Sequence, residues 1–249
     1  TPLNFNSRQI ELVGTTQTVY IENNNGTAAN TISINTNLKI TGVGNKTLTL
    51  GGSHTGTNTF GGAITNASGS TISLTKADAG RWILSGNNTY SGGTTISGGT
   101  LQVGNGGTGG TPGSGGVANS ATLVFSRSDS HTVNNTISGA GSLRIQNVGG
   151  GATILAAANS YSGTTTIRAG ALVAGTDAPS SANGAFGNAA SAIALTDAGT
   201  AADNVALLIG GAYEIARSVT VANNGSGTVT LGGSTADSSL FSGAIALNK

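Results

Sequence analysis

Few side chains in this sequence combine the types and the spacing that catalysis requires. Ser128, Asp129, Ser130 and His131 supply the residue types of a hydrolase triad, but a triad is assembled by geometry from separate elements around an orienting pocket. These four residues are consecutive and fall in what we interpret as a polar turn. We therefore expect a solvated loop here and assign no catalytic residues.

Metal and phosphate sites are equally unsupported. His54 and His131 are far apart and have no acidic or histidine neighbour at a metal-ligand spacing, and the chain has no cysteine. Tandem Gly-Gly-x-Gly-x-Asp runs, which bind calcium in β-rolls, are absent. The stretch Gly104–Gly116 lacks the strand-to-helix context of a phosphate-binding loop, so we expect a flexible surface loop there. We predict no metal and no cofactor.

Acidic residues offer one further possibility. Enzymes that cleave polysaccharides on a β-helix need two or three carboxylates close together on an outer face. The nine acids are thinly spread, and the only plausible cluster is Asp177, Asp197 and Asp203. We therefore predict that the protein is not an enzyme, and we keep a polysaccharide-acting β-helix enzyme as a distant alternative.

The composition excludes several protein classes. Glycine contributes 42 of 249 residues, whereas charged residues contribute 8% and the net charge is +1. Ten Lys and Arg residues balanced by nine acids form no basic patch, so we expect no nucleic-acid partner. No apolar run is long enough for a membrane helix, so we expect no membrane-embedded segment. The chain lacks methionine, from which we expect Thr1 to follow a removed leader or upstream region.

The elements that must position these side chains are short strands. Apolar residues recur two apart, as in Leu48 and Leu50 or Leu143 and Ile145, with Thr, Ser or another small residue between or beside them. Each run ends within a few residues at Gly, Asn or Ser-Gly, where tight turns are sterically easy. No helical periodicity is sustained, so the pattern indicates an all-β protein.

The sequence also repeats itself. Residues 80–104 align without a gap with residues 151–175, an offset of 71 that places Tyr90 over Tyr161. Residues 47–64 align with residues 228–245 at an offset of 181. By this second offset a third copy of the first unit would begin shortly after Lys249, and we expect the array to continue there.

This repeat favours a solenoid over a sandwich. The repeat unit divides into three coils of roughly 24 residues, the length typical of solenoid repeats, which gives about ten coils for the chain. We therefore predict one single-stranded parallel β-helix over residues 1–249. Ile96 and Ile167 should point into its core and Trp82 should lie in or near it. Exposed tyrosine and tryptophan can bind sugars, but Tyr90 and Tyr161 are motif positions, which favours a packing role.

The segment from Gly80 to Gly104 closely resembles the passenger-associated transport repeat of bacterial autotransporters. The pattern Gly-x-Leu-x-Leu-x-Gly-x-Asn-Thr-Tyr-x-Gly-x-Thr-x-Ile, then Gly-x-Leu, is met at some ten positions, and the second copy departs from it at Thr153 and Ala157. The resemblance implies a right-handed β-helix in a secreted or cell-surface bacterial passenger. It implies structural roles for the motif residues Leu84, Asn88, Tyr90, Gly92, Thr94, Ile96, Leu101, Leu155, Asn159, Tyr161, Gly163, Thr165, Ile167 and Leu172.

Two functional hypotheses follow. The first is a non-enzymatic β-helical stalk that displays or forms an adhesive surface, with glycans or proteins of host cells or bacteria as partners. The second is a subunit of an extracellular filament that associates end to end by strand pairing. The strand-like ends, Leu3-Asn4-Phe5 and Ile245-Ala246-Leu247, motivate this alternative.

Overall fold

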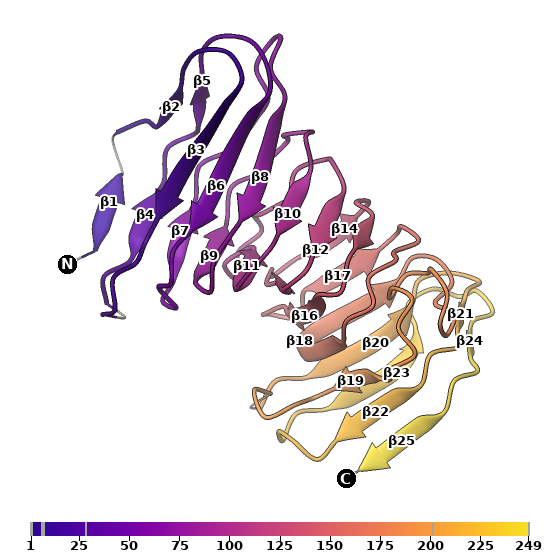
Figure 1. The fold of residues 1–249 in the computed structure, drawn as a ribbon. Helices are drawn as coiled ribbons and strands as arrows, with labels where there is room; N and C mark the ends of the chain where they lie inside the picture. Colours follow the sequence, from indigo (N-terminus) through magenta and orange to yellow (C-terminus); the bar gives the residue numbers. More distant parts are fainter. Residues whose placement is uncertain (1, 6–7, 28, 201, 249) are drawn as a thin grey trace. The chain divides into compact units, whose positions relative to one another are not determined.

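The computed structural model describes all residues except Thr1, Asn6, Ser7, Ala28, Ala201 and Lys249 (Figure 1). The described residues form 25 strands and no helix, which confirms the all-β class. They divide into two compact units, Thr1–Leu123 and Val124–Lys249, and strand β13 (Thr122–Phe125) contains the boundary.

The first unit has two principal parallel sheets. One has the order β1 (Leu3–Phe5), β4 (Ile32–Ile34), β7 (Asn58–Phe60), β9 (Arg81–Leu84) and β11 (Thr100–Val103). The other has the order β3 (Gln17–Glu22), β6 (Lys46–Gly51), β8 (Ile72–Lys76), β10 (Thr94–Ile96) and β12 (Val117–Asn119). A third, short pair joins β2 (Glu11–Leu12) and β5 (Lys39–Ile40).

The second unit follows the same plan. Its first sheet has the order β16 (Ser142–Gln146), β18 (Thr165–Ala174), β19 (Ile193–Leu195), β22 (Val219–Ala222) and β25 (Ile245–Asn248). Its second sheet joins β14 (Ser130–Val133), β17 (Ala152–Leu155), the end of β18, β20 (Val205–Ile209) and β23 (Val229–Gly233). The remaining strands are β15 (Ile137–Ser138), β21 (Glu214–Ile215) and β24 (Leu240–Phe241).

Each coil of the chain stacks on the next in register. In the first unit Thr59 lies between Ser33 of the coil before it and Ile83 of the coil after it. In the second unit Leu195 pairs in the same way with Ile167 of the preceding coil and with Val221 of the following one. Each coil contributes one strand to a sheet. The chain is therefore a parallel β-solenoid of about ten turns, as the repeat predicts.

Aliphatic columns fill the interior because side chains alternate between the two faces of each strand. One column runs through Ile145, Ile167, Leu195 and Val221, all in register and all buried. Ile96 and Trp82 are also fully buried, and the Trp82 indole N–H donates to the carbonyl of Gly51 at 2.9 Å.

The corners of the coils depend on glycine. In the first repeat copy Gly99, with φ of +62°, separates β10 from β11. Its counterpart Gly170, with φ of +70°, lies where β18 passes from one sheet of the second unit to the other. A Cβ atom at Gly170 would lie 2.6 Å from Cβ of Asn147, so this corner has no room for a side chain.

The prediction of a flexible loop at Gly104–Gly116 is wrong. This stretch lies against the preceding coil: the amides of Thr111 and Ser114 donate to the carbonyls of Gly86 and Tyr90 at 3.3 and 2.8 Å. Glycines at positive φ, among them Gly110 and Gly113, let the chain follow that coil closely. A glycine-rich stretch therefore forms an ordered corner of the solenoid.

Two buried lysines complete corners of the first unit. The Lys46 ammonium donates to the carbonyls of Gly14, Thr15 and Val43 at 3.0–3.1 Å. The Lys76 ammonium donates to the carbonyls of Ala77, Asp78 and Gly98, and burial lowers the pKa of Lys76 to about 8, although the nearby Asp78 carboxylate opposes that shift. Each cation thereby joins two successive coils through backbone acceptors.

Candidate functional site

The two repeat copies occupy matching places in the structure. In the first copy Trp82 of β9 pairs with Leu101 of β11, and in the second Thr153 of β17 pairs with Leu172 of β18. The residue numbers of the two pairs differ by 71, which is the offset that aligns the two copies in the sequence. Corresponding residues can therefore be compared contact by contact.

Both motif tyrosines are buried and hydrogen-bonded to a motif threonine on the same coil. The hydroxyl oxygens of Tyr90 and Thr94 are 2.6 Å apart, and those of Tyr161 and Thr165 are 2.8 Å apart. Burial raises the pKa of both phenols, that of Tyr161 to about 12, although their threonine partners oppose the shift. Because neither ring reaches solvent, neither tyrosine offers a platform for a sugar.

The motif asparagines connect three successive coils. Asn88 Oδ1 accepts from the amide of Ile64 at 2.9 Å, and its Nδ2 donates to the carbonyl of Thr111 at 2.8 Å. Asn159 does the same between the amide of Ile137 and the carbonyl of Ala185, at 2.7 Å each. These side chains satisfy backbone groups in the coil before and the coil after their own.

A glycine packs against each tyrosine from the next coil, and sequence comparison misses it. A Cβ at Gly113 would lie 2.6 Å from Cε2 of Tyr90, and one at Gly187 would lie 2.2 Å from the carbonyl oxygen of Tyr161. These glycines lie outside the aligned segments, and their separation in the sequence differs from the offset of the repeat. Their positive φ and their close approach to the tyrosines are visible only in the structure.

The remaining motif residues also face neighbouring coils. A Cβ at Gly92 would lie 2.5 Å from the carbonyl oxygen of Ile72, and one at Gly163 would lie 2.2 Å from that of Gly141. The aliphatic members are fully buried, namely Leu84, Ile96, Leu101, Leu155, Ile167 and Leu172. The motif thus presents stacking surfaces to adjacent coils.

The acidic residues singled out in the sequence do not share one site. Asp177 lines a cleft together with Glu214 and accepts from the Glu214 amide at 2.9 Å, whereas Asp203 lines a different cleft. Asp197 is paired with Arg168. In the part of the chain that the structure describes, no three His, Cys, Asp or Glu side chains are grouped so that they could hold a metal ion.

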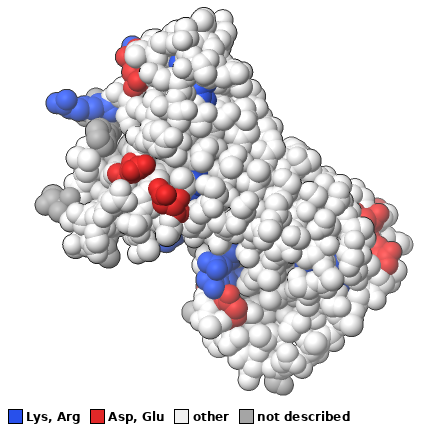
Figure 2. Space-filling model, viewed as in Figure 1, with Lys and Arg blue, Asp and Glu red and all other residues white. Residues whose placement is uncertain are grey.

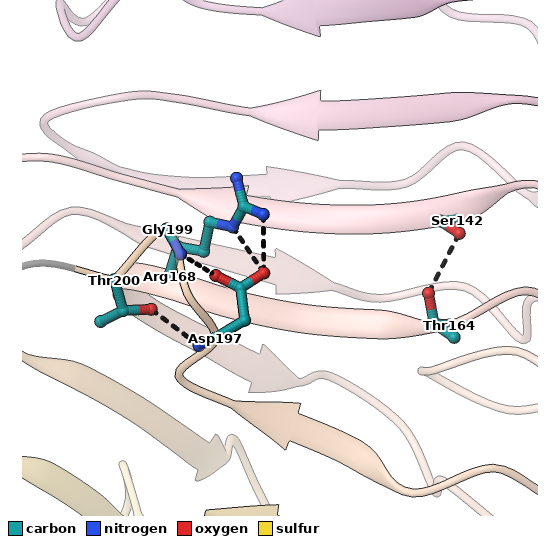
Figure 3. Close-up of polar contacts among 6 residues, drawn as sticks. All are labelled: Ser142, Thr164, Arg168, Asp197, Gly199 and Thr200. Carbon is teal, nitrogen blue, oxygen red and sulfur yellow. Dashed lines mark hydrogen bonds and ion pairs between the residues drawn. The ribbon is translucent and has the colours of Figure 1, made fainter. Parts of the chain in front are cut away.

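The Arg168–Asp197 pair anchors a turn at the margin of the first sheet of the second unit (Figure 3). Arg168 Nε donates to Asp197 Oδ2 at 2.7 Å, and the Gly199 amide donates to Asp197 Oδ1 at 2.7 Å. Partial burial raises the pKa of Asp197, but these hydrogen bonds outweigh it and leave the pKa below its usual value. Farther along the same strands, away from this pair, Thr164 Oγ1 donates to Ser142 Oγ at 3.0 Å (Figure 3). This face offers hydroxyl groups and a neutralised ion pair.

The interpretation of Ser128–His131 as a polar turn is wrong in part, because Ser130 and His131 begin strand β14. The His131 ring packs on Phe125 with centroids 5.5 Å apart, and burial, with a contribution from the Arg127 charge, lowers the pKa of His131 to about 4. The Asp129 carboxylate is bound by the Arg127 guanidinium at 2.9 Å. Asp129 is therefore engaged by an arginine, and these residues form no hydrolase triad.

His54 has a structural setting. Its Nε2 lies 3.0 Å from the carbonyl oxygen of Thr27, and its Nδ1 accepts from the amide of Gly56 at 3.1 Å.

Charged groups are sparse on the face drawn in Figure 2, where uncharged residues cover most of the surface. The described residues include no helix of the length and hydrophobicity needed to cross a bilayer.

Comparisons with known proteins agree with this geometry. Residues 74–103 and 148–174 match the family model of the passenger-associated transport repeat. The chain is also 40% identical over 96 residues to the adhesin BmaC autotransporter of Brucella suis biovar 1 (strain 1330), a match that covers 39% of this chain and 3% of that protein. No solved structure matches the chain.

Both matches cover limited parts of the chain, and the two segments that match the repeat model contain the two buried Tyr–Thr pairs described above. They show that the chain carries two copies of the passenger-associated transport repeat of bacterial autotransporters, and they support a location at the bacterial cell surface or outside the cell.

Proposed function

We propose that this protein is a non-enzymatic β-solenoid stalk with an adhesive outer surface. The observation that supports this function best is the internal use of the repeat motif: in both copies the asparagine bonds to the coils before and after its own, and the tyrosine and threonine bond to each other inside the coil. The similarity of part of the chain to an autotransporter adhesin agrees with an adhesive role. The partners we propose are glycans or proteins on host cells or on other bacteria.

The fold would serve this function mechanically. Each coil provides the hydrogen-bonding edge and the aliphatic column on which the next coil forms, so a chain leaving a pore unfolded would fold coil by coil. Asn88 and Asn159 reinforce each step because they satisfy backbone groups on both neighbouring coils. Such a stalk needs no cofactor to remain rigid.

A cell-binding experiment tests the adhesive function. Beads coated with the purified protein should adhere to cultured host cells or to bacteria more than beads coated with an inert protein of equal charge. Pretreating the target cells with glycosidases or proteases identifies the partner class. Adhesion at the level of the inert beads on all cell types would overturn the proposal.

End-to-end association is the second candidate, and it is supported by the exposed terminal strands. Strand β25 pairs only with β22 among the described strands, and Ile245 and Leu247 are 44% and 69% exposed. Light scattering over a concentration series distinguishes the two functions. A constant mass equal to that of a single chain supports the stalk, whereas growth with concentration supports a filament.

A further inference from the structure

The second unit has a cleft on the outer side of its second sheet that the repeat motif does not explain. Its volume is about 360 Å³, at the small end of the range for small-molecule sites. The floor comes from Ala171 of β18 with Val205 and Ala206 of β20. One rim is Gly149–Gly150, and the other is 202–204.

Comparison of the two repeat copies shows why the surface is hollow there. The outward, paired positions Arg81 and Thr100 of the first copy correspond to Ala152 and Ala171 in the second, which are also paired. Ala206 and Thr230 continue the same row on the next two strands. The turn before the strand changes from Asp78-Ala79-Gly80 to Gly149-Gly150-Gly151, and a Cβ at Gly150 would meet no atom within 4 Å. Small residues thus replace larger ones on the floor and on one rim.

Three polar groups at the cleft have no hydrogen-bond partner in the described part of the chain. They are the Asp203 carboxylate, the Asn204 Nδ2 and the Thr230 hydroxyl; Asn204 uses only its Oδ1, which accepts from the Thr228 amide at 2.8 Å. Asn147, by contrast, is buried and its amide group is engaged by Arg127, Thr153 and Ala171. The cleft therefore combines a small apolar floor with a carboxylate, an amide donor and a hydroxyl.

This combination restricts the ligand. Among the described residues Asp203 is the only charged one that lines the cleft, so it favours a ligand with an N–H or ammonium donor and disfavours an anionic one. Strand β20 is paired on both sides, with β18 and β23, so no free strand edge is available to a peptide here. A sugar ring presents C–H groups to an apolar floor and hydroxyl groups to the polar rim.

We propose that this cleft binds a single hexosamine residue of a surface glycan, with its amino or acetamido nitrogen donating to Asp203. Asn204 donates to a ring hydroxyl and Thr230 exchanges hydrogen bonds with another. The biological use of this site rests on the adhesive function proposed above. The binding itself does not, because it is measured on the purified protein without cells.

The experiment is a titration of the full chain, labelled with ¹⁵N, with four monosaccharides: glucosamine, N-acetylglucosamine, glucose and glucuronic acid. Saturable chemical-shift changes with the two hexosamines should appear at the amides of Gly149, Gly150, Ala171 and Asn204. Glucose should bind more weakly, and glucuronic acid should cause no saturable change.

Two variants and one control sharpen the result. Asp203→Asn should weaken glucosamine binding about tenfold or more, because it removes a charge-assisted hydrogen bond. Ala206→Tyr fills the floor from the outer face and should abolish binding. Asp237→Asn changes an exposed acid that does not line the cleft and should leave binding unchanged.

The proposal is overturned if neither hexosamine causes saturable changes at these amides, or if Ala206→Tyr, shown to be folded by its unchanged spectrum elsewhere, binds as the wild type does. Equal affinity for glucose and glucosamine would also overturn it, because Asp203 would then recognise no nitrogen. If beads coated with the protein fail to adhere to cells while hexosamines still bind, the adhesive function fails and the binding site stands.

Discussion

Replacing Asn159 by alanine removes a side chain that bonds to three coils. Its Oδ1 accepts from the Ile137 amide at 2.7 Å, and its Nδ2 donates to the carbonyls of Ala185 and Ala157 at 2.7 and 3.0 Å. The side chain is buried, so water does not replace these bonds without a change in packing. Asn159→Ala therefore leaves a buried N–H and a buried C=O without partners.

The expected cost follows from those two groups. Leaving one buried donor or acceptor unsatisfied costs about 1–3 kcal/mol, so Asn159→Ala, which leaves two, should lower the free energy of unfolding by about 2–6 kcal/mol. Asn88→Ala should behave similarly, because Asn88 bonds to the Ile64 amide and the Thr111 carbonyl in the same way. Asn134 belongs to the same solenoid unit as Asn159 and is exposed, so Asn134→Ala should change stability by less than about 0.5 kcal/mol.

Urea unfolding followed by circular dichroism measures the global effect, and amide hydrogen exchange at Ile137 measures the local one. Exchange at Ile137 should accelerate in Asn159→Ala and stay unchanged in Asn134→Ala. If the two variants unfold at the same urea concentration, Asn159 does not join the coils and the structural role of the motif is wrong.

Three further predictions concern the core, a corner and a buried cation. Ile167→Asp should unfold the neighbouring coils, since an unpaired charge would enter a dry core; soluble protein with an unchanged dichroism spectrum would contradict the inward position of Ile167. Gly187→Ala should destabilise the protein more than Gly150→Ala, because both have positive φ but only Gly187 would place its Cβ against Tyr161; equal melting temperatures would refute this contact. The pKa of Lys76 in the folded protein is about 8, below its usual 10.5. Between these two pH values the unfolded chain binds more protons than the folded one, so the free energy of unfolding should rise with pH from 8 to 10, by at most about 3 kcal/mol. Lys76→Met should remove that rise, and an identical pH dependence of wild type and Lys76→Met in urea unfolding would contradict the assignment.

The sequence was sufficient to predict the solenoid and its repeated packing residues. Residues in equivalent places of the two repeat copies must fit the same narrow interior, so matching positions such as Tyr90 and Tyr161 recur at a fixed offset. That offset reflects real register, because the pairs Trp82–Leu101 and Thr153–Leu172 are equivalent in the structure.

Contacts between coils of unequal length could not be predicted in this way. Coils in the second unit differ in length, because the paired residues Leu143 and Thr165 are closer together in the sequence than the paired residues Ile167 and Leu195. The glycines that pack on Tyr90 and Tyr161 therefore fall at different offsets from the tyrosines. The error at Gly104–Gly116 has a related cause: glycine was interpreted as flexibility, but positive φ at Gly110 and Gly113 is what lets this corner pack closely.

The cleft near Asp203 was also beyond sequence reasoning. Asp203 was grouped with Asp177 and Asp197 by spacing, whereas the structure places it with Thr230 and the small residues of the floor. The exchange of Arg81 and Thr100 for Ala152 and Ala171 is visible in the alignment. Whether this exchange opens a cleft depends on which face of the strand the two alanines occupy. Only the strand register in the structure shows that they lie side by side on the outer face.

Coil-on-coil register is the central claim, and disulfide formation tests it most directly because the chain has no cysteine of its own. Thr166 of β18 pairs with Ala194 of β19, and Ala194 pairs with Thr220 of β22. Adjacent strands lie about 4.8 Å apart, within disulfide range, whereas strands two coils apart are about twice as distant. The double variant T166C/A194C should form an intramolecular disulfide under mild oxidation, detected by mass spectrometry, and T166C/T220C should not. Failure of the first pair to form a disulfide, or equal formation in the second, would contradict the stacked parallel solenoid.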